Sequence, residues 1–393
     1  MQYDYDLIIV GGGLAGNSLA LALKDTHLKI AIIEAKTIEQ LKQSPAGDRA
    51  LALAAGTVNA LKQLNSWQGI SHCATAIKQI HVSDKGHFAK ARLSAQANNV
   101  EALGYVIAAK DIEGHLLDLI QASNIEVLSP AQVLNLTNTE QSITVDLKQG
   151  DTEKQLTAKL VVGADGGQST VRELLSIKQI GHDYGQTALV TTVKTALPNN
   201  NVAFERFTAS GPLALLPICK NHSAVVWTRR TKEAEVLLNS SETEFTAQLQ
   251  QCFGYKLGRL ILTAPRRAFP LVLIRAEKML SGRAVIIGNA AHQLHPVAGQ
   301  GFNLGLRDVL CLADYIKQNL ADCGDAELLN RYAKMRQKDQ DLTIQFTDNV
   351  VRLFSNEWLA LAAVRSLGLL ALDHLPMAKN FLARHAMGLA QNS

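Results

Sequence analysis

The chain has 393 residues, of which 47% are hydrophobic and 19% are charged, a composition typical of a globular protein with about two to three domains. Its net charge of +4 comes from lysines and arginines spread along the sequence, without the block of like charge that marks a nucleic-acid-binding tail, so we expect no nucleic acid partner. The five cysteines form no close pair and the N-terminus lacks the basic start of a signal peptide, which argues against a disulfide framework, a zinc site and export, and favours a cytoplasmic protein.

A dinucleotide-binding fingerprint follows the first predicted strand, Asp6–Val10. The run reads GGGLAG and opens a helical pattern, which is the context that G-x-G-x-x-G requires. The first glycine makes the turn, the second admits a pyrophosphate, and the third lets helix and strand pack closely. A second strand, Lys29–Ile33, ends at an acid that would bind a ribose hydroxyl. The candidate cofactor residues of this stretch are Gly11, Gly13, Leu14, Ala15, Gly16 and Glu34.

The next stretch offers a candidate phosphate ligand. Arg49 stands at the head of an apolar run, Ala50–Leu64, whose spacing predicts a helix. A guanidinium suits phosphate oxygens, so Arg49 either binds the cofactor pyrophosphate or is an ordinary exposed arginine at a helix start. Beyond it, Ile77–Asn99 alternates apolar and polar residues like strands of a surface sheet, which would interrupt the cofactor domain.

A strand followed by a helix returns at Tyr105–Leu119. Lys110, near the predicted helix start, is either another phosphate neighbour or a solvated lysine. Two apolar runs, Gln132–Leu134 and Ile143–Leu147, then predict strands of a small meander. We include Val133, in the first of these runs, among the candidate cofactor residues.

A second glycine-rich turn lies in Leu160–Arg172, which reads LVVGADGGQSTVR. The pattern predicts an apolar strand, a turn that holds Asp165, and a short helix with Ser169 as its N-cap. An aspartate in a glycine turn usually bonds to the backbone of that turn.

The pattern then changes to short alternating runs between residues 186 and 230, which predict an antiparallel sheet. Ser241–Gln251 has helical spacing, and Ala268–Leu273 returns to a strand. A parallel, cofactor-type architecture therefore encloses a β-rich insertion, whose sheet would form a lid over the ring of a ligand.

The third motif, Gly288–Asp308, reads GNAAHQLHPVAGQGFNLGLRD and follows the short strand Ala284–Ile287. If a helix starts near Gly299, its first amides and its positive dipole end point into the loop, where they would stabilise a negatively charged ring or phosphate. The alternative is an ordinary connection from strand to helix. The candidate cofactor residues here are Asn289, Gly299, Gln300, Gly301 and Asn303.

Together, GGGLAG with Glu34, GADGGQSTVR and the third motif resemble the single-component FAD-dependent aromatic hydroxylases over residues 1 to about 346. The third motif is most similar to the ubiquinone-biosynthesis branch, especially its 2-polyprenyl-6-methoxyphenol (2-octaprenyl-6-methoxyphenol) hydroxylases. The resemblance implies that the first glycines and Glu34 hold the ADP half of FAD, and that Arg49 contacts its phosphates. It further implies that Asp165 serves FAD and reduced nicotinamide, and that the loop around Gly301 lies beside the isoalloxazine ring.

The resemblance implies an α/β fold with four segments. These are a Rossmann-like FAD-binding domain over residues 1–180, interrupted near 77–99 by strands of the substrate sheet, a β-rich substrate domain over 181–274, the continued FAD-binding domain over 275–346, and a C-terminal helical segment over 347–393. Two positions depart from the wider family, which often has aspartate at position 289 and arginine at position 110. Asn289 keeps an acceptor oxygen, so FAD binding should survive. The lysine puts a phosphate role at position 110 in doubt.

The implied activity is hydroxylation of a polyprenylated phenol in ubiquinone biosynthesis, with NADH or NADPH as electron donor, molecular oxygen as co-substrate and a flavin hydroperoxide as oxygen donor. Only one G-x-G-x-x-G in strand-helix context is present, so the nicotinamide would bind without a Rossmann domain of its own. The sequence identifies no side chain as the base for the phenol. His292 and His295 lie nearest to the flavin loop, and His295 is the candidate catalytic residue, although loop histidines are more often structural.

Other functions stay open on the sequence. A flavin-dependent halogenase would share the first motif, but the tryptophan-rich motif of that group is missing. A prenyl-chain reductase would also use FAD and a lipid, without consuming oxygen. A non-catalytic flavoprotein that presents a lipid within a ubiquinone-biosynthesis assembly is a third alternative.

The C-terminal stretch Trp358–Leu372 is apolar around nearly the whole helix circumference. At about 1.5 Å per residue it would reach roughly 22 Å, short of the ~30 Å hydrocarbon core, so it does not predict a membrane span. Such a helix is buried in its own protein, in another subunit or partly in lipid. We expect reversible contact at the inner face of the membrane, where a polyprenylated substrate would partition.

Overall fold

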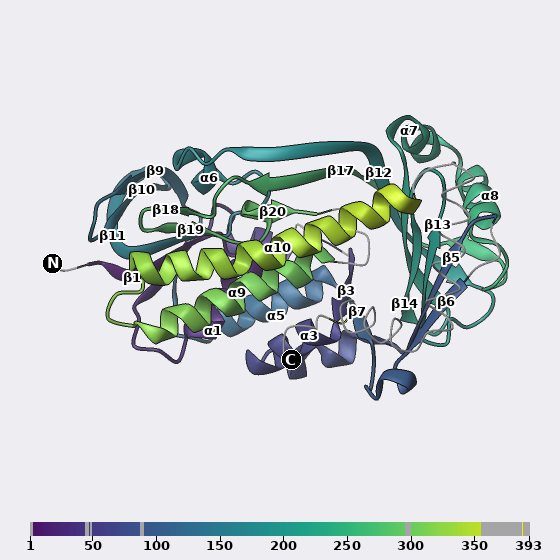
Figure 1. The fold of residues 1–393 in the computed structure, drawn as a ribbon, viewed down its shortest axis with the longest axis horizontal. Helices are drawn as coiled ribbons and strands as arrows, with labels where there is room; N and C mark the ends of the chain where they lie inside the picture. Colours follow the sequence, from purple (N-terminus) through teal and green to yellow (C-terminus); the bar gives the residue numbers. More distant parts are fainter. Residues whose placement is uncertain are drawn as a thin grey trace.

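The computed structural model describes residues 3–43, 47, 49–86, 90–294, 300–354 and 387. Two large sheets lie towards opposite ends of an elongated molecule, with a small three-stranded sheet between them (Figure 1). Helices cover the first sheet, and a mostly antiparallel sheet is inserted between its strands in the sequence. The expected α/β fold class with a β-rich insertion is therefore confirmed.

An eight-stranded sheet carries all three motifs at the ends of its strands. Its strands are β1 (Tyr5–Val10), β2 (Ile30–Ile33), β8 (Glu126–Leu128), β9 (Gln132–Asn138), β10 (Ile143–Gln149), β11 (Thr152–Gly163), β18 (Leu280–Ser281) and β19 (Ala284–Ile286). The centre is parallel, because β1 pairs with β2 and β11, and β11 pairs with β19. The continuous apolar runs of the sequence thus become strands that are buried on both faces.

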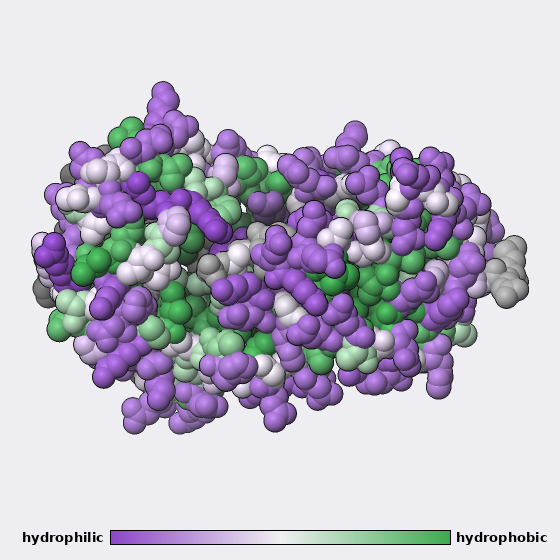
Figure 2. Space-filling view, turned by 180° about the vertical axis from the view of Figure 1, so that it is seen from behind, coloured by the Kyte–Doolittle hydropathy of each residue, from purple (hydrophilic) through white to green (hydrophobic). Residues whose placement is uncertain are grey.

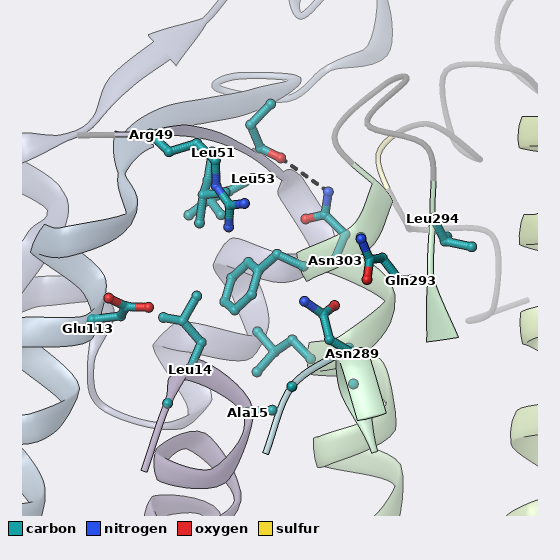
Figure 3. A pocket seen from close by; sticks show the side chains of 18 of the residues that line it. Leu14, Ala15, Arg49, Leu51, Leu53, Glu113, Asn289, Gln293, Leu294 and Asn303 are labelled. Atoms are coloured by element: carbon teal, nitrogen blue, oxygen red, sulfur yellow. Dashed lines mark hydrogen bonds between the residues drawn. The ribbon is translucent and has the colours of Figure 1, made fainter. Parts of the chain in front are cut away.

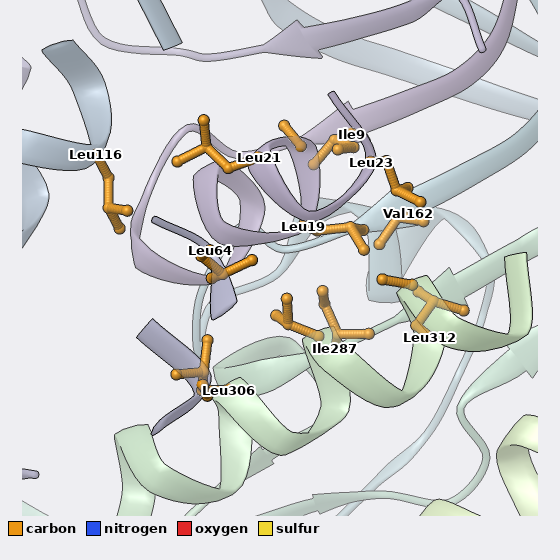
Figure 4. Packing of buried hydrophobic residues seen from close by; sticks show 14 of the residues in the cluster. Ile9, Leu19, Leu21, Leu23, Leu64, Leu116, Val162, Ile287, Leu306 and Leu312 are labelled. Carbon is orange, nitrogen blue, oxygen red and sulfur yellow. The ribbon is translucent and has the colours of Figure 1, made fainter. Parts of the chain in front are cut away.

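Helices of the first half and of the last third of the chain share one core against this sheet. They are α1 (Leu14–Leu23), α5 (Ala109–Gln121), α9 (Gln300–Gln318) and α10 (Ala326–Phe354). Leu19 of α1 and Leu312 of α9 are fully buried near Ile287, as Figure 4 shows. Truncation of such a leucine to alanine costs about 2 to 5 kcal/mol. The core therefore fixes the first motif relative to the third.

The second large sheet has nine strands. They are β5 (Gln79–Asp84), β6 (Lys90–Ser94), β12 (Gln179–Thr195), β13 (Val202–Phe207), β14 (Leu213–Cys219), β15 (His222–Arg230), β16 (Leu260–Leu262), β17 (Arg267–Ala276) and β20 (His292–Gln293). Helices α7 (Thr231–Asn239) and α8 (Glu242–Phe253) cover its outer face, where Trp227 packs edge-on against Phe245. Its inner face is turned towards the first sheet.

Strands β12 and β17 form a long antiparallel ribbon that joins the two large sheets (Figure 1). The predicted domain boundaries at residues 180/181 and 274/275 both fall inside this ribbon. The chain therefore passes between the two parts through paired strands rather than through loops.

One predicted helix begins too early. Ala50–Leu64 is not a single helix, because residues 50–54 form strand β3 (Ala50–Ala54) and only α3 (Ala55–Gln63) is helical. Strand β3 pairs with β7 (Gly104–Ala108), which also pairs with β4 (Thr75–Ile77). Pairing with a strand that lies far away in the sequence overrides a pattern that suits a helix locally. Helix α7 was not predicted.

Short elements complete the described chain. They are α2 (Ile38–Lys42), α4 (Trp67–Ile70), η1 (Ser71–Cys73), η2 (Gln96–Asn98), α6 (Thr170–Leu174) and η3 (Gly288–Ala290). As predicted, Ser169 caps α6, since its side chain accepts a hydrogen bond from the backbone N–H of Arg172.

The view from behind shows hydrophilic residues over most of the surface, with hydrophobic residues in separate patches between them (Figure 2). Among the described helices, none has the length and apolar character needed to cross a bilayer. The predicted apolar helix Trp358–Leu372 lies outside the described residues.

Candidate active site

A cavity of about 1540 Å³ lies between the two large sheets. This volume exceeds that of a typical pocket for one small ligand, so the cavity has room for a cofactor and a substrate together. Most of the predicted cofactor residues line it, although they come from three distant parts of the sequence. Those that line it are Gly11, Gly13, Leu14, Ala15, Glu34, Arg49, Val133, Asp165, Asn289, Gly301 and Asn303.

The three glycines of the first motif differ in what surrounds them. Gly11 has a φ of +107°, and a Cβ there would lie 2.6 Å from the carbonyl oxygen of Ala164. A Cβ on Gly16 would overlap the carbonyl oxygen of Gly11, so Gly16 allows close packing of helix and strand and does not itself line the cavity. A Cβ on Gly13 would meet no atom within 4 Å. Gly13 thus borders open space where backbone can approach a ligand.

Glu34 is tied to the glycine turn that it was predicted to accompany. Its carboxylate accepts hydrogen bonds from the backbone N–H groups of Gly12, at 2.7 Å, and of Lys36, at 2.9 Å. A carboxylate has about four acceptor positions, so both oxygens can still receive a ligand hydroxyl. Asn17 fixes the same turn from the other side by donating to the Gly12 carbonyl at 2.7 Å.

The second motif braces the third through buried polar groups. Asp165 accepts hydrogen bonds from the hydroxyl of Ser169, at 2.5 Å, and from the backbone of Val171, at 3.0 Å. Arg172 is 5% exposed and donates to the carbonyl oxygens of Gly167 and Ala290. The Asp165 side chain therefore bonds to its own turn, as turn aspartates usually do, and Asp165 also lines the cavity.

Asp308, in the third motif, is the centre of a buried network. Its carboxylate accepts from the backbone of Gly288 at 3.2 Å, from His292 Nε2 at 2.5 Å and from Arg336 Nε at 2.8 Å. Burial favours the neutral form of Asp308, but His292 and Arg336 outweigh it and hold the pKa of this carboxyl below its usual value. The network fixes η3, and with it Asn289, against α9 and α10.

Several predicted side chains surround the same space from different elements (Figure 3). Leu14, Arg49 and Asn289 line the cavity from the first motif, the start of β3 and η3, and Glu113 of α5 joins them. Asn303 behaves differently, because its side chain accepts from Ala54 N and Thr57 Oγ1 and donates to Ala52 O. Its amide therefore holds β3 and α3 to α9.

Not every candidate reaches the cavity. His292 is 1% exposed and does not line it, so its ring serves the Asp308 network. Lys110 is also absent from the lining. His295 and Gly299 lie outside the described residues, and Gln300 is described only by its backbone, as the first residue of α9.

The opposite wall is the inner face of the nine-stranded sheet, which the sequence predicted as a sheet over the ligand without identifying the residues that line it. This wall is largely apolar, and alternate residues of β5, β12 and β14 line the cavity, as the pleat of a strand requires. It includes Ile80, Val82, Ala188, Val190, Ala203, Phe207, Ala214, Leu216, Val226 and Leu271. One carboxyl, Glu205, lies among them. The alternation of the predicted run 202–207 was the signal available, because it places Glu205 on the same face as Ala203 and Phe207.

Comparison with known proteins agrees with this geometry. Residues 4–347 match a family model described as an FAD binding domain. The chain is 35% identical over 394 residues to the ubiquinone hydroxylase UbiL of Rhodospirillum rubrum, a match that covers 98% of this chain and 89% of that protein. It is 28% identical over 390 residues to the 3-demethoxyubiquinol 3-hydroxylase of Escherichia coli, with 98% of each chain covered.

A solved structure shares the fold. The p-nitrophenol 4-monooxygenase PnpA from Pseudomonas putida DLL-E4 superposes with a TM-score of 0.81 over the whole of both chains, at 18% identity.

Proposed function

This chain belongs to the family of FAD-dependent monooxygenases that share the FAD binding domain, and we propose that it hydroxylates the aromatic ring of a polyprenylated phenol in ubiquinone biosynthesis. Reduced nicotinamide and molecular oxygen would be its co-substrates. The observation that carries the proposal is a single cavity with two unlike walls. Backbone and polar groups line the wall formed by the three motifs, whereas apolar side chains line the wall formed by the nine-stranded sheet.

The motif wall fits FAD. The open space beside Gly13, which a Cβ would enter, suits a pyrophosphate, and Glu34 retains acceptor positions for a ribose hydroxyl. Arg49 lines the same wall and offers a guanidinium to phosphate oxygens. When bound, FAD supplies hydride acceptance from the nicotinamide and activation of oxygen for transfer to the ring.

The protein would supply position, charge stabilisation and exclusion of water. Helix α9 is described from Gln300, so the backbone N–H of Gly301 belongs to its first described turn, where helix amides point towards the N-terminal end. Gly301 lines the cavity, and this amide together with the helix dipole would stabilise negative charge on the reduced cofactor. The apolar sheet would keep water from the reacting centre.

The sheet wall supports a substrate with an apolar tail. Its side chains present surface that a prenyl chain would cover, and burial contributes about 25 cal/mol for each Å² removed from water. The two relatives named above are described as hydroxylases of ubiquinone or of its precursor, which favours a polyprenylated ring over a small phenol. Such a lipid also implies reversible membrane contact, for which Trp358–Leu372 is the candidate segment.

Oxygen uptake by the purified flavoprotein tests this proposal. We expect NADH or NADPH to reduce the bound flavin, and oxygen consumption to rise when a prenylated methoxyphenol is added, with one oxygen atom from labelled O₂ in the product. Alkene reduction without oxygen uptake would instead indicate a prenyl-chain reductase. Absence of any turnover, with the substrate nevertheless bound, would indicate a lipid-presenting flavoprotein.

A further inference from the structure

Glu205 interrupts an otherwise apolar cavity wall. Strand β13 is central in its part of the sheet, and Glu205 is paired with Val82 of β5 on one side and with Ala214 of β14 on the other. Its neighbours on the same face of β13 are Ala203 and Phe207, and all five residues line the cavity. The carboxyl is therefore surrounded by hydrocarbon and half-buried, and it faces the space that the proposed substrate would occupy.

No hydrogen bond or ion pair holds the Glu205 carboxyl within the part of the chain that the structure describes. The cationic side chains on and beside β13 bind groups on the outer face of the sheet. Arg206, the next residue, donates to the Phe253 carbonyl on the outer face of the sheet at 3.2 Å. His81 of β5 packs against the Phe204 ring, and its Nδ1 lies 2.7 Å from Lys256 Nζ.

The other titratable groups near this wall are few. On β5, Asp84 is two residues from Val82, and on β14 the only titratable side chain is Cys219 at the end of the strand. The remaining charged residues that line the cavity are Glu34, Lys36, Arg49, Glu113 and Asp165, and none of them belongs to the nine-stranded sheet. With no cation beside it, burial raises the pKa of Glu205 to about 7.

We propose that Glu205 is the catalytic base that takes the hydroxyl proton of the phenol, an assignment that rests on the proposed function. The phenol O–H bond breaks, the proton forms an O–H bond on the carboxylate, and the electron pair stays on the phenolate oxygen. The phenolate donates electron density into the ring, which makes the ring carbon more reactive towards the transferred oxygen. After oxygen transfer the ring is a dienone. Its C–H bond breaks and releases a proton to water, the ring oxygen takes back the proton held by Glu205, and Glu205 is again ionised.

The surroundings of Glu205 bring its pKa closer to that of the phenol. A phenol has a pKa of about 10, whereas an ordinary glutamate has one of about 4.5 and is a weak base towards it. Burial of Glu205 reduces the difference between its pKa and that of the phenol. Catalytic bases work best when their pKa lies near the working pH. An unpaired carboxyl also weakens the fold at an apolar position, where a hydrocarbon side chain would pack better. A role towards a ligand accounts for a carboxyl here.

Glu205→Gln tests the proposal, because it keeps the shape of the side chain and removes the base. The measurements are FAD content, flavin reduction, and kcat across acid and alkaline pH with a methoxyphenol that bears a short prenyl chain. We expect kcat to fall by about 100-fold or more with FAD content unchanged, and the fall of wild-type activity below about pH 7 to disappear from the variant's profile. A fluorinated and hence more acidic phenol should shrink the deficit, because it ionises without help.

Two further variants serve as controls for Glu205→Gln. Glu205→Asp keeps a carboxyl and should retain the acid limb of the profile even if its kcat is lower. Glu242→Gln, on the exposed start of α8 behind the same sheet, should match wild type. Glu205 is not the base if Glu205→Gln keeps kcat within a few-fold of wild type with the same pH profile. A wild-type protein that consumes no oxygen with the probe would instead refute the proposed function itself.

Discussion

The two walls of the cavity are built by different means. The motif wall is held by backbone hydrogen bonds and buried charges, such as those of Glu34 with Gly12 and of Asp308 with Arg336. The sheet wall consists of alternating side chains such as Val82 and Ala214, which are fixed by strand pairing. A wall that recognises invariant cofactor atoms needs glycines and fixed polar groups, whereas a wall that recognises a lipid needs only shape and apolar surface. Substitutions should therefore affect the two walls in different ways.

The largest effect is expected at Gly13. Its φ of −86° suits a valine backbone, and no neighbouring atom lies within 4 Å of an added Cβ, so Gly13→Val should fold. Its side chain would nevertheless occupy the pyrophosphate position, and we expect bound FAD to fall from stoichiometric to near zero. Flavin absorbance per protein, with circular dichroism as the check on folding, measures this. Full flavin content in a folded variant would refute the assignment of this wall.

A large loss of stability is expected at Asp308. Asp308→Asn removes a negative charge that pairs with the buried Arg336. Breaking a buried ion pair of this kind costs about 3 to 5 kcal/mol of stability. Asp322→Asn is the matched control, because its pair with Arg283 involves a side chain that is 39% exposed and should contribute about 1 kcal/mol or less. Urea unfolding of both variants gives the two values. Equal losses would show that the buried network does not brace the motif wall.

A smaller effect is expected on the sheet wall at Val226. Val226→Thr keeps the volume but places a hydroxyl beside the apolar residues Val190 and Ala214 on the paired strands, and an unpaired hydroxyl costs about 1 to 3 kcal/mol. We expect the KM for a long-tailed phenol to rise by about tenfold, with FAD content unchanged. Steady-state oxygen uptake with long-tailed and short-tailed substrates would show the difference. A loss of FAD instead would mean that the walls are not separable.

The smallest expected effect is on the pH dependence of stability. Because the pKa of Glu205 rises from 4.5 to about 7 on folding, the folded chain binds this proton more tightly than the unfolded chain. The stabilisation of the folded state by the protonated Glu205 is therefore fully present below pH 4.5 and is lost as the pH rises to about 7. The wild-type protein should lose stability over that interval relative to Glu205→Gln, as urea titrations at several pH values would show. Parallel curves would place the Glu205 pKa at its ordinary value.

The motif wall could be predicted from the sequence because its chemistry is local. GGGLAG followed by Glu34 is a short pattern, and Gly11 and Gly16 lie where their missing side chains are needed. The role of Asn303 was harder to foresee, since its amide binds Ala52 and Ala54, which are about 250 positions away. Only the folded chain brings these residues together.

The sheet wall could be predicted as an antiparallel sheet over the ligand, but the residues that line the cavity could not. The register that places Glu205 between Val82 and Ala214 joins segments from separate parts of the chain, and no motif encodes it. Strand β3 was missed for the same reason, because its pairing with β7 decides its conformation. The polar exception in an alternating apolar run is nevertheless visible in a sequence once the strand is recognised.

The most direct test of the two-walled cavity is a crystal structure of the protein with FAD and a short-tailed prenylated phenol. We predict that the pyrophosphate lies against Gly13, and that the phenol ring and prenyl chain lie against the inner face of the nine-stranded sheet, with the phenol oxygen within hydrogen-bonding distance of Glu205. FAD bound away from Gly13, or a phenol bound outside the sheet wall, would contradict this account.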